Sequence, residues 1–147
     1  HMLRDSIGNE EFQKGIQSYY RHFMNSNAST EDFLHEMEQV SGKVLKAFFD
    51  QWLYHSENLM INGNWKYDSV KKQVIIKLEQ SQKTNYVFDV PIEMGIYQTG
   101  SPVPKISKFR MNSKNTQFTI SVDSKPEKVV VDPRTVLLAM VEFGKAK

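Results

Sequence analysis

The sequence predicts an α+β protein: an N-terminal segment of three helices followed by an antiparallel β-sandwich of about seven strands. The first observation is that the apolar spacing changes near residue 58, from steps of three and four to steps of two. The second is that turn-forming residues separate the short apolar runs after that point. No helical pattern lies between those runs, which favours an antiparallel sandwich. We therefore predict two domains, residues 1–58 and residues 59–147.

The three predicted helices are defined by apolar stripes and by capping residues. The first stripe begins at Leu3 and Ile7 and continues through Phe12, Ile16, Tyr19, Tyr20 and Phe23. Ser29 and Asp32 have the spacing of a capping box that opens a second helix, and Gly42 is expected to end it. The buried face of this second helix is predicted to carry Phe33, Met37 and Val40. The third helix is predicted to bury Leu45, Phe48, Phe49, Trp52 and Leu53.

The predicted strands show alternating apolar residues. The clearest run is "YVFDVPIEMGIY", in which one face carries Phe88, Val90, Ile92, Met94 and Ile96. Two further runs place Val74, Ile76 and Leu78, and then Phe118, Ile120 and Val122, on single faces. Shorter strands are expected over residues 61–67, 106–111, 128–131 and 136–141. Pro91 lies inside the clearest run, which favours an edge position or a bulge there.

Composition excludes several classes of function. A chain of 147 residues that is 39% hydrophobic can bury a sizeable core. The net charge of +2 comes without a basic stripe, so nucleic-acid binding is not supported. No run approaches the roughly 20 apolar residues of a membrane span. The absence of cysteine excludes disulfides, thiolate zinc ligands and cysteine nucleophiles, and no feature indicates a cellular compartment.

The stretch "HEMEQ", residues 35–39, is one residue away from the zinc-binding motif H-E-x-x-H. Gln39 stands where the second histidine would be, and glutamine is a poor zinc ligand. One large zincin class takes a third ligand from a glutamate 18 residues after the second histidine. That position is Asn58 here, and Glu57 is one residue short. We interpret His35, Glu36, Glu38 and Gln39 as solvated polar residues of a helix.

Two groups of aromatic residues are candidate platforms for stacking on a ligand. The cluster "WLYH", residues 52–55, resembles an aromatic sugar platform, but Trp52 and Leu53 fit the core at a helix end better. Trp65 and Tyr67 alternate on the first predicted strand and are candidates for stacking on a ligand, with packing in the core as the plainer interpretation. No G-x-S-x-G elbow and no phosphate-cradling glycine loop is present. We therefore assign no catalytic, cofactor-binding or metal-ligating residue in this chain.

Several spaced motifs together resemble the M1 (gluzincin) family of zinc aminopeptidases. The helical part carries the family's two patterns in Leu3, Arg4, Ile7, Gly8 and Phe12, and in Ser41, Gly42, Leu45, Phe48, Phe49 and Trp52. Residues 51–68 are similar to the passage into the family's β-sandwich, residues 74–97 to the strands that follow, and residues 129–139 to its closing hairpin. Glu57, Asn58 and Leu59 depart from the family's G-x-P at the local turn.

The resemblance implies a particular place in a larger enzyme. In the family, H-E-x-x-H, the third-ligand glutamate, the G-x-M-E-N segment and the catalytic tyrosine all precede the "LRDSIG" region. It therefore implies a non-catalytic C-terminal fragment of a zinc aminopeptidase: the end of the catalytic domain and the sandwich, acting as a structural brace. The rest of the parent would pack on the helices, and zinc and the peptide substrate would belong to the parent. We expect an exposed apolar patch on the helices, through which an isolated fragment could form an artificial dimer.

Two other functions remained open. One is a standalone peptide- or carbohydrate-binding sandwich with a helical cap, with Trp65 and Tyr67 as stacking residues. The other is a self-sufficient hydrolase, which needs catalytic residues that the sequence patterns do not offer.

Overall fold

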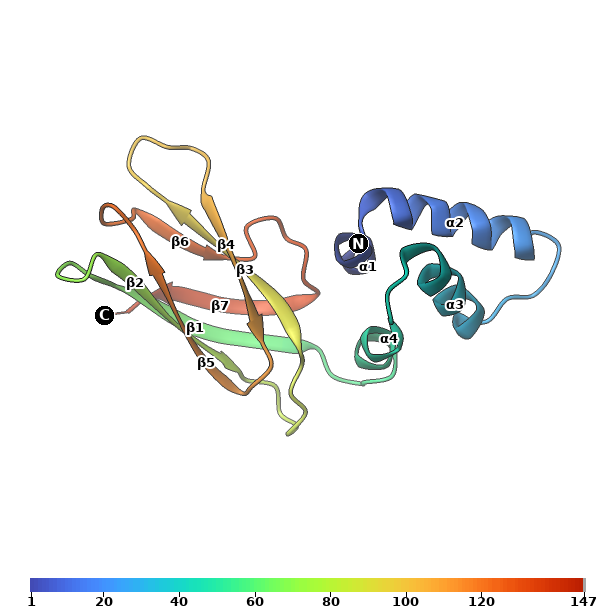
Figure 1. Ribbon diagram of the computed structural model, residues 1–147. Coiled ribbons are helices and arrows are strands. Elements are labelled where there is room, and N and C mark those ends of the chain that lie inside the picture. Colours follow the sequence, from blue (N-terminus) through green and yellow to red (C-terminus); the bar gives the residue numbers. More distant parts are fainter. Residues whose placement is uncertain (147) are drawn as a thin grey trace. The chain divides into compact units, whose positions relative to one another are not determined.

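The structure is a computed structural model that describes residues 1–146. The chain forms two compact units: a helical unit, His1–Ser56, and a sandwich unit that begins at Glu57. Figure 1 shows the helices in blue to teal, and then the strands in green to red. The predicted α+β fold class, with helices before a sandwich, is confirmed.

The helical unit contains four helices where the sequence predicted three. They are α1 (Met2–Ile7), α2 (Asn9–Phe23), α3 (Thr30–Ser41) and α4 (Lys46–Leu53). The single first helix that the apolar stripe predicted is divided at Gly8, whose φ of 106° and ψ of 153° are far from helical. Few residues other than glycine adopt that conformation. The apolar stripe did not reveal the break because the residues on either side keep the helical spacing.

The predicted capping signals of α3 are confirmed. The Ser29 main-chain N–H donates to Asp32 Oδ2 (2.8 Å), and the Asp32 N–H donates to Ser29 Oγ (3.1 Å). At the other end Gly42 adopts the left-handed conformation (φ 65°), and its N–H donates to the Glu38 carbonyl (2.9 Å). Local hydrogen bonds therefore define α3 at each end.

The core of the helical unit lies between α3, α4 and the start of the chain. Its buried members are Ile7, Met37, Leu45 and Phe49, and Leu3, Phe12, Phe33, Leu34 and Phe48 pack against them. At Gly15 of α2 an added Cβ would lie 2.5 Å from Met37 Sδ, so this glycine allows α2 to approach α3 closely. Leu53, predicted to be buried, is 55% exposed because α4 ends at this residue.

The sandwich unit contains seven strands among the described residues. They are β1 (Leu59–Asp68), β2 (Gln73–Gln80), β3 (Val90–Tyr97), β4 (Lys105–Met111), β5 (Asn115–Ser121), β6 (Lys128–Val131) and β7 (Ala139–Lys145). One sheet has the order β5-β2-β1-β7 and the other the order β4-β3-β6. All neighbours are antiparallel except β1 and β7, which pair in parallel from Leu59↔Ala139 to Trp65↔Lys145. The expectation of an antiparallel sandwich therefore fails for this one pair.

The predicted inward faces form the sandwich core. The residues from Phe88 to Ile96 that were predicted to share a face are all buried, as are Val74, Ile76 and Leu78. Phe118 is half-buried and stacks on Phe109 of β4, with ring centroids 4.2 Å apart. Pro91 lies in β3, the central strand of its sheet, but β3 pairs with β6 only from Met94 to Tyr97. At Pro91 the strand has a partner on one side only, which suits a residue without an N–H.

Candidate functional site

The "HEMEQ" residues lie on α3, where their polar groups take part in helix packing. His35 and Gln39 are exposed, as expected. Glu36, predicted to be solvated, is instead buried, with 9% of its surface exposed, and its Oε1 lies 2.7 Å from His22 Nδ1 of α2. Hydrogen bonds from Ser18 and then from His22 hold the pKa of Glu36 below its ordinary value. The interpretation of Glu36 as an ordinary surface residue was therefore wrong.

Glu38 has a second structural role in the same helix. Its Oε1 accepts a hydrogen bond from the Leu45 N–H (2.6 Å), a main-chain group at the start of α4 that no helical carbonyl satisfies. Each of the two "HEMEQ" carboxylates thus joins α3 to another helix. The sequence does not reveal either contact, because each depends on how the helices pack.

The donors near "HEMEQ" do not fit a zinc site. No group of three His, Asp or Glu residues positioned to hold a metal ion occurs in residues 1–146. Glu57, one residue short of the third-ligand spacing counted from Gln39, accepts hydrogen bonds from Thr84 within the sandwich unit. That no residue of this chain ligates zinc stays a prediction, which metal analysis of the purified protein would test.

The aromatic candidates do not form an open platform. Trp65 is only 4% exposed, and the Lys145 Nζ lies 5.8 Å from its ring centroid. Trp52 is half-buried, with its ring 6.4 Å from that of Phe48. Tyr54 is exposed, and its hydroxyl donates to Glu31 Oε1 (3.1 Å), which raises the pKa of this tyrosine. The buried Trp65 supports the interpretation of this residue as core.

An exposed apolar surface does occur on α2. Ile16, Tyr20 and Met24 are 40%, 65% and 56% exposed, and their spacing of four residues places them on one face of the helix. Beside this α2 stripe lies an open hollow whose lining residues are Tyr19, Tyr20, Phe23, Met24, Ser26, Asn27 and Ala28. Three of these seven lining residues are aromatic and none is charged. This surface therefore suits packing against apolar groups better than acid–base catalysis.

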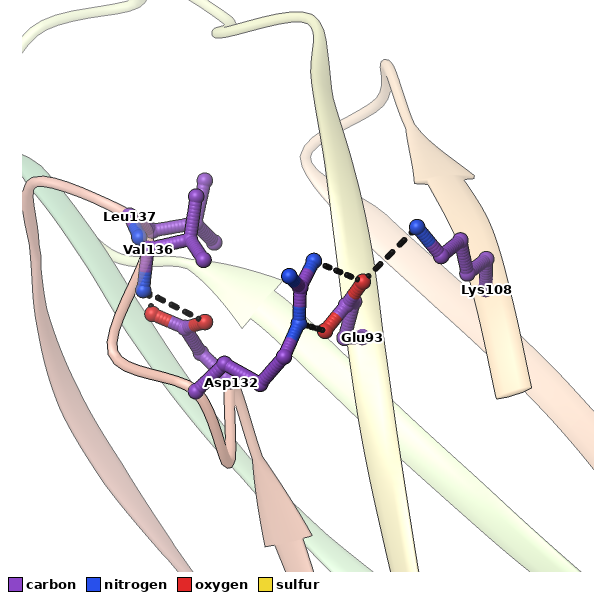
Figure 2. Close-up of polar contacts among 6 residues, drawn as sticks. Glu93, Lys108, Asp132, Val136 and Leu137 are labelled. Atoms are coloured by element: carbon purple, nitrogen blue, oxygen red, sulfur yellow. Dashed lines mark hydrogen bonds and ion pairs between the residues drawn. The ribbon is translucent and has the colours of Figure 1, made fainter. Parts of the chain in front are cut away.

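The strongest polar constellation is one that the sequence did not reveal. Glu93 of β3 is buried, and its two oxygens accept from Arg134 Nε (2.7 Å) and Arg134 Nη2 (2.6 Å). Lys108 Nζ of β4 lies 2.9 Å from Glu93 Oε1. Figure 2 shows the Glu93 carboxylate between Lys108 and the loop that begins at Asp132. Two cations therefore share one buried carboxylate across three segments of the sandwich unit.

Asp132 organises the loop that carries Arg134. Its carboxylate accepts from the N–H groups of Val136 (2.9 Å) and Leu137 (2.8 Å), as Figure 2 shows. Its own N–H donates to the Glu93 carbonyl (2.7 Å). These bonds form a loop where the sequence predicted a strand from residue 136, and β7 begins only at Ala139.

Protonation of Glu93 is expected to destabilise the sandwich unit at low pH. The hydrogen bonds from Arg134, with Lys108 in support and burial in opposition, lower the pKa of Glu93 from 4.5 to about 2. Because the folded state holds the proton less tightly, the carboxylate stabilises the fold above about pH 4.5, by at most about 3 kcal/mol. That contribution declines as the pH falls below about 4.5 and is lost once the pH has fallen through about 2.

Urea unfolding of the wild type and of Glu93→Gln, followed from near neutral pH down to strongly acidic buffer, measures this contribution. The difference between the two free energies of unfolding should be largest near neutral pH and should shrink toward zero in acid. A difference that does not change with pH would contradict the proposed role of the ionised carboxylate.

No helix among residues 1–146 has both the length and the apolar character needed to cross a membrane. This agrees with the composition.

Comparisons with known proteins give a consistent class. Residues 1–52 match the Peptidase family M1 domain. Glutamyl aminopeptidase of Rattus norvegicus is 31% identical over 97 residues, which are 63% of this chain and 10% of the relative. Aminopeptidase M1-A of Oryza sativa is 27% identical over 120 residues, covering 82% of this chain and 13% of the relative. The chain spans about a tenth of the length of these curated relatives.

A solved structure supports the fold of the whole chain. The crystal structure of Legionella pneumophila aminopeptidase A in complex with aspartic acid aligns with a TM-score of 0.76 at 18% identity. The alignment covers 99% of this chain and 17% of that protein. At this identity the likeness concerns the fold. The family match of residues 1–52 and the curated relatives relate this chain to the M1 aminopeptidases.

Proposed function

We propose that this chain is a non-catalytic, structural part of a larger M1 aminopeptidase. Residues 1–58 would form the end of its catalytic domain and residues 59–147 its sandwich domain, which braces that domain. The observation that carries the proposal is the match of residues 1–52 to the M1 peptidase domain, in a chain that spans about a tenth of its aminopeptidase relatives. The match stops one residue before the end of α4, close to the start of the sandwich unit.

The exposed α2 stripe supports the same proposal. Ile16, Tyr20 and Met24 present apolar side chains that the helical unit does not cover. A small helical unit that is part of a larger domain needs such a surface for packing, and apolar patches of this kind usually mark an interface. The proposed occupant is the remainder of the parent peptidase.

The activity belongs to the proposed parent. The parent would remove N-terminal residues from peptides in a metal-dependent reaction, with zinc held by residues outside this chain. The contacts of Glu36 and Glu38 in "HEMEQ" support a zinc site outside this chain, because each carboxylate already bonds to a group of another helix or its cap. The alternative of a standalone binding module is weakened by Trp65, whose ring is buried.

The proposal predicts the size of the native protein and the metal content of the isolated chain. An antibody raised against this chain should detect, in a fresh lysate of the source cells, a band several times larger than 17.1 kDa. Metal analysis of the isolated chain should find no stoichiometric zinc, and His35→Ala should leave the metal content unchanged. A native band at 17.1 kDa, or stoichiometric zinc that His35→Ala removes, would overturn it.

A further inference from the structure

The segment Asp132–Leu138, called the strap below, lies over the outer face of β3. Ile92, Met94 and Ile96 point into the core, so Glu93 and Gly95 face the opposite side of the strand. A Cβ added at Gly95 would lie 3.0 Å from the ring of Pro133, which places the strap directly on the β3 backbone. The strap connects β6 of one sheet to β7 of the other.

The strap is held in a strained conformation by polar contacts. Asp132 has φ 49° and Thr135 has φ 53°, and neither is a glycine. A β-branched residue such as Thr135 rarely adopts this conformation, which persists only where surrounding contacts enforce it. The contacts present are the bidentate Arg134–Glu93 pair and the bonds that the Asp132 carboxylate accepts from the strap's own amides.

The strand that follows the strap has little apolar cover. In β7, Met140 and Val141 are 61% and 39% exposed, and Leu138 at the end of the strap is 62% exposed. β7 lies at the edge of its sheet and pairs there with β1 alone, in the parallel arrangement that is slightly the weaker per residue. Segments with few buried apolar contacts are those that open locally before a domain unfolds. The attachment of the strap and β7 to the rest of the sandwich unit therefore depends on the polar contacts of the strap.

We propose that the strap and β7 form a locally opening unit of the sandwich, and that the Glu93–Arg134 pair is the latch that keeps it closed. Release of Arg134 frees the strap to leave the outer face of β3 and to relax Thr135. β7 then separates from β1, and the four-stranded sheet is left with β1 as its edge. The open form exposes the backbone of β1 from Leu59 to Trp65, which pairs with β7 in the closed form.

Amide hydrogen exchange of the full chain tests this proposal, with Glu93→Gln compared against Asp89→Asn. Asp89, just before β3, is a matched control because it forms a similar bidentate pair, with Arg110 of β4 (2.6 and 2.7 Å). In Glu93→Gln the amides of Val136, Leu137 and β7 should exchange at least about tenfold faster than in the wild type, and they should still exchange faster than those of β2 and β5, whose exchange follows the stability of the whole unit. Asp89→Asn should leave the strap amides at the wild-type rate.

Two further measurements keep the test decisive if Glu93→Gln folds poorly. Arg134→Gln removes the strap's side of the latch while Lys108 still neutralises Glu93, and it should give the same regional pattern. In the unmodified protein, amides of β7 should respond to less denaturant than amides of β2. Equal opening free energies for the amides of β7 and β2 in the unmodified protein would mean that β7 opens only with the whole unit, and unchanged strap amides in the variants would mean that Glu93 is not the latch. Either result overturns the proposal.

Discussion

Replacing Gly63 with alanine is expected to lower the free energy of unfolding of the sandwich unit by roughly 3–5 kcal/mol. Gly63 lies in the middle of β1, in register with Leu78 of β2 and Phe143 of β7. A Cβ at this position would overlap the Lys77 carbonyl oxygen and would lie 2.7 Å from Leu78 Cδ2. The carbonyl belongs to the backbone of a paired strand, so it cannot move aside without breaking the β1–β2 ladder.

Gly144→Ala is the matched control for this prediction. Gly144 lies in β7 of the same sheet, and a Cβ there would meet no atom within 4 Å. The same substitution should therefore change the stability by less than about 1 kcal/mol. Urea unfolding followed by far-ultraviolet circular dichroism compares the two variants with the wild type. Equal stability of Gly63→Ala and Gly144→Ala would show that the β1–β2 pair can relax around a methyl group.

The sequence predicted those parts of the fold that are governed by local periodicity. The inward residues of β2 and β3 recur at every second position, because the side chains of a strand point alternately to the two faces of the sheet. The capping box of α3 was predictable because Ser29 and Asp32 bond across three residues. In each case the determining contacts lie within a single element or one face of it.

The features that were missed depend on contacts between distant segments. Glu93 and Arg134 are 41 residues apart, and no local pattern indicates that a polar residue on β3 will be buried beneath the strap. The parallel placement of β7 follows from the strap, which carries the chain from one sheet to the other. Glu36 was misjudged because its partner, His22, lies on another helix.

The candidate site illustrates the same limit. The separation of "HEMEQ" from zinc chemistry rests on ligand type, since Gln39 is a poor ligand, and it stays a prediction. What Glu36 and Glu38 do instead could not be predicted, because the sequence does not say which helices face α3. The resemblance to M1 peptidases supplied the class from spaced motifs, and the comparisons support that class.

Replacing Gln80 with leucine is expected to destabilise the sandwich unit by roughly 3–5 kcal/mol, although leucine has a similar volume. The Gln80 side chain is 1% exposed and bonds to both main-chain groups of Phe88. Its Nε2 donates to the Phe88 carbonyl (2.7 Å), and its Oε1 accepts from the Phe88 N–H (2.8 Å). The amide thus takes the place of a neighbouring strand just before β3 begins at Val90.

The substitution would leave the N–H and C=O of Phe88 buried without these partners, and each buried group of this kind costs about 1–3 kcal/mol. Oε1 of Gln80 also accepts from Gln82 Nε2 (3.1 Å), so that amide loses a partner as well. Gln117→Leu on β5 is the control, because Gln117 is exposed and the same change removes no buried hydrogen bond there. Urea unfolding should separate the two variants by at least about 2 kcal/mol. Equal stabilities would mean that Phe88 finds other partners when the Gln80 amide is removed, and that the amide does not hold the start of β3.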